Sequence, residues 1–183
     1  MKVEALAIPE VLLLRPAVFA DDRGWFFESF NEATFARVTG IEARFVQDNH
    51  SGSAKGVLRG LHYQLPPHAQ GKLVRAVRGR VFDVAVDLRQ SSPSFGRWVG
   101  VELTEDGREQ LWIPAGFAHG FLALSEWAEV AYKTTAPWHA ASERALAWDD
   151  PAVGIAWPVE GGVPRLSPKD AAAASLARAE MFG

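Results

Sequence analysis

The chain has 183 residues, of which 48% are hydrophobic and 22% charged, and this balance predicts one packed domain over residues 1–183. A net charge of −3 argues against a dedicated nucleic-acid binder, and the absence of cysteine excludes disulfides, thiolate metal sites and cysteine nucleophiles. Apolar runs such as Val11–Leu14 are too short to span a membrane, and no secretory pattern opens the sequence, so we expect a cytoplasmic protein without membrane or nucleic-acid partners.

Helix signals are few and stand near the two ends of the chain. The residues Asp21–Gly24 indicate the tip of a hairpin. Further along, Asn31 is suited to be the N-cap of a short helix that runs through residue 38 and is ended by Gly40. The tail has a clearer signal, because Ser167–Asp170 combines an N-cap serine, a first-turn proline and a capping-box acid. We therefore expect a C-terminal helix over 171–181.

In the middle of the chain, side chains alternate with the period of two that is typical of short strands, and Gly- and Pro-rich turns separate these runs. Many short strands at near-regular spacing are typical of an all-β sandwich or barrel. The 7 Trp and 11 Phe beside 16 Gly also suggest a β-rich protein with a flat ligand. The predicted strands are Ala43–Asp48, Val57–Gln64, Leu73–Val77, Arg80–Leu88, Trp98–Leu103, Gln110–Ile113, Gly120–Leu124 and Glu129–Thr134.

Alternation makes a specific prediction about two acidic residues in the strand Arg80–Leu88. Asp83 and Asp87 fall on the same face as Val81 and Ala85. Burying unpaired acids is unfavourable, so this face either lies outside or lines a polar cavity.

Three segments carry more polar groups than the strands of a closed core should. One runs from Val46–Ser51 to Gly56–Gln64, where alternation places His62 and Arg59 on opposite faces. The others are Gln70–Val74 and Trp112–Phe121, and the latter delivers His119 from a tight loop. Residues from several such strands of one small barrel could gather in its interior and form a site.

Taken one at a time, these residues have ordinary structural interpretations. A lone strand histidine such as His62 is more often a hydrogen-bonded core residue than a catalyst, and Lys72 alone reads as a solvated turn lysine. Asp170 is most simply a helix cap, Asp48-Asn49 could be turn formers, and Tyr132 reads as a strand aromatic.

A metal site is not predicted. Metal-binding barrels of the cupin type usually present a His-x-His pair, but His62 is followed two residues later by Gln64. Lys72 stands where a carboxylate ligand would be expected. Oxygen atoms with one imidazole make a weak transition-metal site.

Long blocks of the sequence resemble the dTDP-4-dehydrorhamnose 3,5-epimerase family. The likeness runs in register from about Ile8 to Asp170, so it covers nearly the whole chain. The blocks that carry it include Asp21–Glu28, Val46–Ser51, Gly56–Leu65, Gly71–Val74, Val81–Leu88, Ser92–Gly96, Ile113–Leu124, Tyr132–Thr134, Trp148–Pro151, Ile155–Pro158 and Leu166–Asp170.

The resemblance implies a cupin-like jelly-roll β-barrel without metal, with a few short helices. It implies epimerisation of dTDP-4-dehydro-6-deoxy-D-glucose at C3 and C5 to dTDP-4-dehydro-L-rhamnose, without a cofactor. It also implies a homodimer, in which the N-terminal part of one subunit contributes to the site of the other. The product would serve dTDP-L-rhamnose biosynthesis for cell-wall polysaccharide or lipopolysaccharide O-antigen.

The resemblance assigns four residues to catalysis. His62 matches the base, and a neutral imidazole suits proton abstraction near pH 7. Asp170 matches the carboxylate that orients this histidine and favours its protonated form. Lys72 matches the residue near the C4 oxygen, where an ammonium stabilises the developing enolate. Tyr132 matches the acid that returns a proton from the opposite face of the sugar.

The same resemblance assigns binding positions around the nucleotide and the sugar. Arg59, and Arg23 from the partner subunit, suit the diphosphate, and Trp138 stands where the family places a thymine-stacking aromatic, often tyrosine. Alternation alone suggests Asp83 as a partner of Lys72. Phe26 and Phe121 are candidates for apolar site walls or for core. The other matched binding residues are Glu28, Gln47, Asp48, Asn49, His119, Glu143 and Lys169.

Two departures and three rival functions remain open at this point. The loop 137–143 lacks the Pro-Glu pair common in the family, which leaves base selectivity less defined, and the chain ends soon after Asp170. The nearest rival is an epimerase of an antibiotic deoxysugar pathway that acts at C3 or C5 alone. The others are a non-catalytic nucleotide-sugar-binding cupin and a metal-dependent cupin oxygenase or isomerase.

Overall fold

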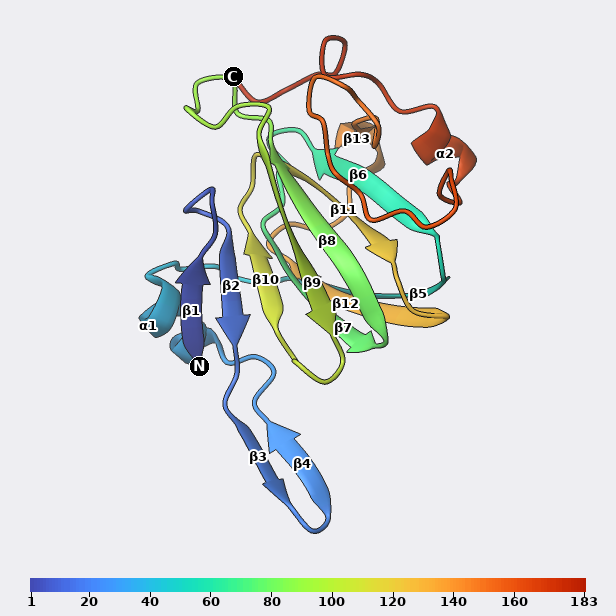
Figure 1. Ribbon diagram of the computed structural model, residues 1–183. Helices are drawn as coiled ribbons and strands as arrows, with labels where there is room; N and C mark the ends of the chain where they lie inside the picture. The colour runs from blue at the N-terminus through green and yellow to red at the C-terminus, as the bar shows by residue number, and fades with distance from the viewer.

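A computed structural model describes residues Met1–Gly183, and these form two facing antiparallel sheets with a projecting hairpin (Figure 1). The first sheet has the order β1-β2-β10-β7-β12-β5 and the second β13-β6-β11-β8-β9. The first sheet contains β1 (Lys2–Ala5), β2 (Leu12–Arg15), β10 (Gln110–Ile113), β7 (Lys72–Arg78), β12 (Trp127–Thr134) and β5 (Gln47–Ala54). The second contains β13 (Glu143–Ala145), β6 (Leu58–Gln64), β11 (Phe117–Ala123), β8 (Arg80–Asp87) and β9 (Trp98–Thr104).

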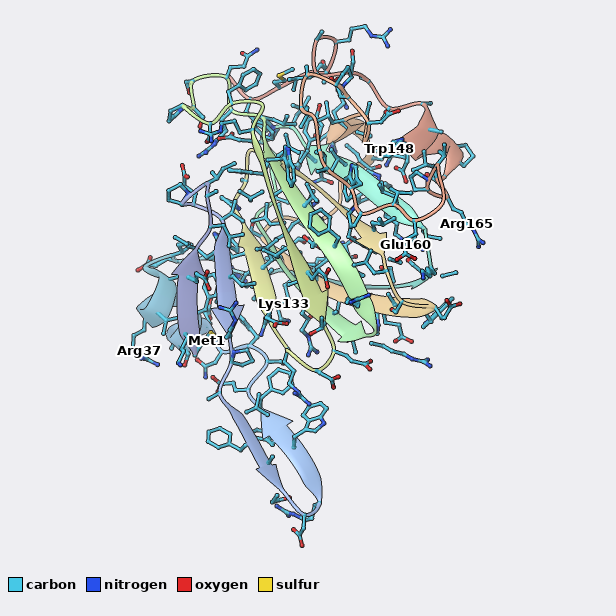
Figure 2. All side chains as sticks on the ribbon, viewed as in Figure 1. Met1, Arg37, Lys133, Trp148, Glu160 and Arg165 are labelled. Atoms are coloured by element: carbon cyan, nitrogen blue, oxygen red, sulfur yellow. The ribbon has the colours of Figure 1, made fainter.

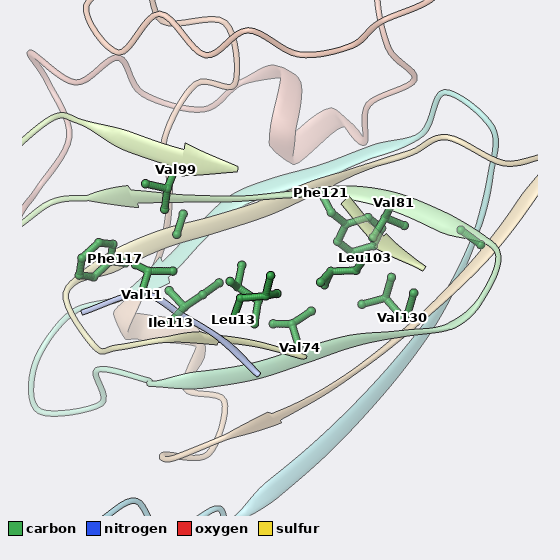
Figure 3. Packing of buried hydrophobic residues seen from close by; sticks show 14 of the residues in the cluster. Val11, Leu13, Val74, Val81, Val99, Leu103, Ile113, Phe117, Phe121 and Val130 are labelled. Atoms are coloured by element: carbon green, nitrogen blue, oxygen red, sulfur yellow. The ribbon is translucent and has the colours of Figure 1, made fainter. Parts of the chain in front are cut away.

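The main hydrophobic core lies between the two sheets (Figure 3). Alternating strands supply it, for example Val74 of β7 and Val130 of β12 against Phe121 of β11 and Val81 of β8. The opposite face of the second sheet packs against the C-terminal segment, where Phe182 contacts the cluster that contains Tyr63. Because both faces of β6, β8 and β11 are covered, the side chains on these strands are held in defined positions.

The predicted all-β jelly-roll class is confirmed, and each strand predicted from Val57 onward has its counterpart. The predicted N-terminal helix is also confirmed as α1 (Glu32–Thr39), with Asn31 accepting from the backbone N–H of Thr34 and Gly40 in the left-handed conformation. The strand predicted at Ala43–Asp48 is displaced, since β5 begins only at Gln47. Strands β1, β2 and β13 are not predicted by the sequence pattern, because each has only three or four residues and lacks clear alternation.

The predicted C-terminal helix over 171–181 is wrong. Only α2 (Pro168–Ala171) is helical, and the chain then leaves the helix so that Ala174 bridges to Leu146 and Phe182 to Arg89. These backbone bridges and the burial of Phe182 against the second sheet stabilise an irregular path. Helix propensity in the alanine-rich stretch is a weak preference that these tertiary contacts override.

The expected hairpin tip at Asp21–Gly24 joins β3 (Val18–Asp21) to β4 (Gly24–Phe27). This hairpin stands away from the two sheets, and its side chains project on either side of the ribbon (Figure 2). Phe19, Trp25 and Phe26 are more than half exposed, an apolar display that an isolated domain would normally bury. No helix in the chain has the length and apolar character needed to cross a membrane.

Candidate active site

A cavity of about 720 Å³ opens between the sheets and the C-terminal segment, within the size range of small-molecule sites. Strands β5, β6, β7, β11, β12 and β13 line it, together with the loop before β13 and the start of α2. The lining residues include Gln47, Asn49, Ser51, Arg59, His62, Gln64, Gln70, Lys72, His119, Phe121, Tyr132, Trp138, Glu143, Arg165, Lys169 and Asp170. Eleven of the fourteen site residues expected from the resemblance are in this set.

His62 and Asp170 form a hydrogen-bonded pair at the cavity wall, with 2.6 Å between Nε2 and Oδ1. The Ser167 hydroxyl caps α2 by accepting from the backbone N–H of Asp170, so the Asp170 carboxylate is free to face β6. Burial would raise the pKa of Asp170, but the hydrogen bond and charge of His62, with further hydrogen bonds from Ser167 and the backbone of Gly60, lower it overall. Asp170 is therefore an anion at neutral pH, and its carboxylate orients the His62 ring.

A bulge in β6 corrects the predicted facing of Arg59 and His62. The register pairs His119 with His62 but Phe121 with Arg59, so β6 has one extra residue over this stretch. Gly60 takes up the irregularity at φ 130°, a conformation that residues with a Cβ rarely adopt. Both Arg59 and His62 consequently line the cavity, although strict alternation places them on opposite faces.

Lys72 begins β7, lines the cavity and is almost completely buried. Its Nζ donates to the backbone carbonyl of His62 at 3.1 Å. Burial lowers the pKa of Lys72 to about 8, against the opposing charges of Asp83 and Glu143, while Lys169 acts in the same direction as burial. The Lys72 ammonium thus lies beside β6, the strand that carries His62, and it loses its proton at a pH just above neutrality.

Asp83 is fully buried in β8, and its direct partner is His119 rather than Lys72. Both Asp83 carboxylate oxygens lie 3.0 Å from His119 Nε2. Burial lowers the pKa of His119, so the ring is neutral near pH 7, and the pairing places its proton on Nε2. Asp87, the second acid on this face, accepts from the side chains of Arg89, Ser92 and Ser94. Each acid on the inner face is therefore partnered.

Tyr132 in β12 enters the cavity from the first sheet, opposite the strand that carries His62. Its ring packs edge-on against His119, with 6.3 Å between centroids. Burial raises the pKa of Tyr132, partly offset by the charge of Arg59, so the phenol keeps its proton at neutral pH. A neutral hydroxyl can donate a proton to a bound carbon acid's conjugate base.

Two cations of the cavity differ in how they are paired. Arg59 donates to the Ser53 hydroxyl and to the carbonyl of Gly52, both at 2.9 Å, so its charge is not matched by a carboxylate. Lys169 lies 2.6 Å from Glu143. Burial would raise the pKa of Glu143, but the hydrogen bond and charge of Lys169 lower it overall. Arg59 is thus left to bind an anionic ligand.

Three expected site residues are not brought to this cavity. Arg23 is on the hairpin tip and binds Asp21, and Glu28 accepts from the Asn31 side chain at 3.2 Å. Asp48 lies on the opposite face of β5 and pairs with Lys133, so Asp48-Asn49 are strand residues rather than turn formers.

The two phenylalanines proposed as site walls separate in the structure. Phe121 is buried in β11 and lines the cavity. Phe26 lies on the exposed hairpin and takes no part in the cavity of its own chain.

The polar residues that line the cavity but were not assigned to the site from the sequence include Ser51, Gln64, Gln70 and Arg165. Both glutamines stand in the polar segments singled out above, and a polar residue in a buried strand is the signal that could have marked them. Arg165 has no such signal, because it reaches the cavity only through a parallel bridge to Val57.

The donor set of the cavity suits acid–base chemistry. No three His, Cys, Asp or Glu side chains come together as ligands for a metal ion. His62 and His119 each have one ring nitrogen bound to a carboxylate. A base paired with a carboxylate, a buried ammonium and a neutral phenol can together remove a proton beside a carbonyl, stabilise the anion and return a proton.

Comparison with known proteins agrees with this chemistry. A sequence profile of the family described as dTDP-4-dehydrorhamnose 3,5-epimerase matches residues 5–178. The dTDP-4-dehydrorhamnose 3,5-epimerase of Pseudomonas aeruginosa is 57% identical, over 100% of this chain and 99% of its own. A dTDP-6-deoxy-D-glucose-3,5-epimerase from Legionella pneumophila, solved in complex with dTDP-4-keto-L-rhamnose, is 49% identical with a TM-score of 0.94, over 98% of this chain and 94% of its own.

Monoepimerases share the same scaffold at lower identity. A 3′-monoepimerase from Streptomyces bikiniensis, solved in complex with dTDP-quinovose, is 34% identical with a TM-score of 0.89, over 97% of this chain and 88% of its own. The full-length match and the higher identity to the double epimerases settle the affiliation: this chain belongs to the dTDP-4-dehydrorhamnose 3,5-epimerase family.

Proposed function

We propose that this chain is an isomerase that epimerises dTDP-4-dehydro-6-deoxy-D-glucose at C3 and C5 to dTDP-4-dehydro-L-rhamnose. The observation that carries the proposal is the His62–Asp170 pair, 2.6 Å apart, in a cavity that also holds Lys72 and Tyr132. The full-length relatives bear the name of this reaction. The cavity and the names together support the substrate class.

In the proposed mechanism the C4 ketone acidifies the protons at C3 and C5. His62 accepts one of these protons, and the electron pair of the broken C–H bond forms an enolate. The charge of Asp170 favours the resulting imidazolium, and the Lys72 ammonium stabilises the enolate oxygen. Tyr132 then gives its proton to the carbon from the opposite face, which inverts the centre and re-forms the ketone. His62 and Tyr132 recover their original protonation through solvent before the second centre reacts.

Deuterium incorporation tests the proposal on the wild-type protein. Incubation with the substrate in deuterated water should place deuterium at both C3 and C5, read by nuclear magnetic resonance or mass spectrometry. Label at one carbon alone would establish the rival monoepimerase. Binding of the substrate without any exchange would establish a non-catalytic binder, and loss of activity with a chelator would establish a metal-dependent reaction.

Replacing Tyr132 with phenylalanine should separate proton abstraction from proton return. Tyr132→Phe keeps the ring but removes the hydroxyl, so we expect residual deuterium exchange while complete epimerisation falls by about 10²-fold or more. The measurement compares solvent exchange with product formation in one reaction. Full two-centre turnover at the wild-type rate would show that another group supplies the proton.

The proposed partner is a second copy of this chain. The β3–β4 hairpin exposes Phe19, Trp25 and Phe26 and carries Arg23 at its tip, outside the cavity of its own chain. An exposed apolar arm is suited to packing on another subunit. The arm would bring Arg23 to the diphosphate in the site of the other subunit, where Arg59 supplies the first guanidinium.

Subunit mixing tests this shared site. Arg23→Ala should raise KM by about tenfold or more, because it removes a bidentate contact to the diphosphate. Neither Arg23→Ala nor His62→Ala has an intact site as a homodimer, but a mixed dimer has one. Co-expression in equal amounts, assayed at a substrate concentration well below KM, should therefore restore the wild-type rate at about one quarter of the sites. No restoration, with mixed dimers verified by mass spectrometry, would mean that Arg23 does not act across subunits.

Two predictions concern the cellular setting of this reaction. One is that the reaction takes place in the cytoplasm. The other is that the product supplies dTDP-L-rhamnose for cell-wall polysaccharide or lipopolysaccharide O-antigen.

A further inference from the structure

The loop that carries Trp138 is held by three glutamine side chains from separate segments of the chain. Gln70 Nε2 donates to the carbonyl of Ala136 at 2.7 Å, and Gln64 Nε2 donates to the carbonyl of Pro137 at 3.2 Å. Gln47 Oε1 accepts from the backbone N–H of Trp138 at 2.9 Å, and Gln64 Oε1 accepts from that of His139 at 2.8 Å. Each of the four consecutive residues 136–139 is thus bound to a glutamine side chain.

Gln64 is the central member of this group. It is 3% exposed, and its second amide hydrogen is directed to the carbonyl of His68 at 2.7 Å. Both donors and the acceptor of its side-chain amide are therefore in use, which defines the orientation of the group. The same residue connects the loop after β6 with the loop before β13, and the rings of His68 and His139 stack at 3.8 Å between centroids.

The other two glutamines attach the loop to the first sheet. Gln47 begins β5, and its Nε2 donates to the Asn49 side chain at 2.9 Å, which fixes the amide that receives Trp138. Gln70 lies two residues before Lys72, the first residue of β7. The loop is consequently tied to β5, to β6 and to the segment that leads into the catalytic lysine.

These contacts hold the backbone while the indole of Trp138 stays available. The Trp138 residue is 58% exposed although it lines the cavity, so few packing contacts restrain it. An exposed platform fixed before binding loses less conformational freedom when a flat ligand stacks on it.

We propose that Gln64, with Gln70 and Gln47, forms a positioning clamp that presets Trp138 as the platform for the nucleobase. This inference rests on the proposed function, because it takes the base of a dTDP-sugar as the ligand of Trp138. The clamp acts through the platform and not through the reacting atoms. Its loss weakens nucleotide binding and base selectivity, whereas the proton transfers at C3 and C5 keep their rate once substrate is bound.

A double-mutant cycle between Gln64 and Trp138 tests the clamp. Gln64→Met has a similar length but makes none of the three hydrogen bonds. We expect it to weaken dTDP binding, measured by calorimetry, by about tenfold in the wild-type background, and to change kcat by less than about twofold. In a Trp138→Ala background, which has no platform to position, the same substitution should change the dissociation constant by less than about twofold.

Matched variants keep the outcome interpretable. Ser125→Ala removes a side chain that joins the backbone of Arg80 to that of Trp127 at a turn outside the cavity, and it should leave dTDP binding unchanged. Gln70→Met removes only the hydrogen bond to the carbonyl of Ala136, and it replaces Gln64→Met in this cycle if that variant does not fold. Equal weakening by the Gln64 substitution in both backgrounds, or no weakening in either, would overturn the clamp. Absence of dTDP binding by the wild-type protein would instead overturn the proposed substrate class.

Discussion

His62→Ala is expected to lower kcat for epimerisation by about 10²- to 10⁴-fold and to remove solvent exchange at both C3 and C5. The reason is that one base, held by Asp170 at 2.6 Å, serves both centres in the proposed mechanism. Deuterium incorporation followed by mass spectrometry measures the two carbons separately. Exchange that persisted at one carbon would show that a second base acts there.

Two companion variants sharpen this experiment. Asp170→Asn preserves the size of the side chain but removes the charge that favours the imidazolium, so kcat should fall to a value between those of wild type and His62→Ala. His50→Ala is the control, because His50 lies on β5 outside the cavity and pairs with Glu129. A loss of activity in the control would point to a general effect of removing a histidine from the first sheet.

Epimerase activity is expected to fall as the pH rises through about 8. The pKa of Lys72 is lowered to about 8 by burial, so below this pH the ammonium is present and above it the stabilising charge on the enolate is lost. Tyr132 does not account for the same decline, because burial raises the pKa of its phenol above the ordinary value. Lys72→Met should lower kcat by about 10²- to 10³-fold and remove this pH dependence.

Asp83→Asn is expected to move the alkaline decline to lower pH. The charge of Asp83 is the largest effect that opposes the lowering of the Lys72 pKa, so its removal lets burial lower that pKa further. Activity near pH 8 should fall more than activity near pH 6.5. The measurement is kcat against pH at saturating substrate, since kcat reports groups in the bound enzyme.

A control and a contrary outcome complete this test. Lys133→Met removes an ammonium that pairs with Asp48 on the outer face of β5, and its pH profile should match that of wild type. If Asp83→Asn lowered activity equally at every pH and left the pH of the alkaline decline unchanged, Asp83 would act only by orienting His119. A purely structural role of Asp83 would leave the pH of the alkaline decline unchanged.

Much of the scaffold follows from local pattern. The period-two runs in β8 and β9 and the turn residues between strands are consequences of side-chain geometry that needs no tertiary information. The N-cap Asn31 and the C-terminal Gly40 of α1 act within a few residues of each other for the same reason. The motif blocks in β6 and β11 likewise pointed to His62 and His119, and both residues line the cavity.

The predictions that the structure corrects all depend on contacts between segments that are distant in the sequence. The 171–181 stretch has helix propensity, but the bridges of Ala174 and Phe182 to other parts of the chain decide its path. The bulge at Gly60 turns Arg59 toward the cavity through its pairing with β11, which strict alternation does not include. Alternation placed Asp83 on the inner face correctly, but only the side-chain contact between β8 and β11 shows that its partner is His119.

From the sequence alone come the all-β class, the family and the residue types that acid–base chemistry at a carbonyl needs. These properties depend on short-range periodicity and on motifs that are contiguous along the chain. The tertiary structure alone gives the 2.6 Å contact between His62 and Asp170, buries Lys72 so that its pKa is about 8, and ties the Trp138 loop to three glutamines. Such properties depend on burial and on distances between segments remote in sequence, which no local pattern contains.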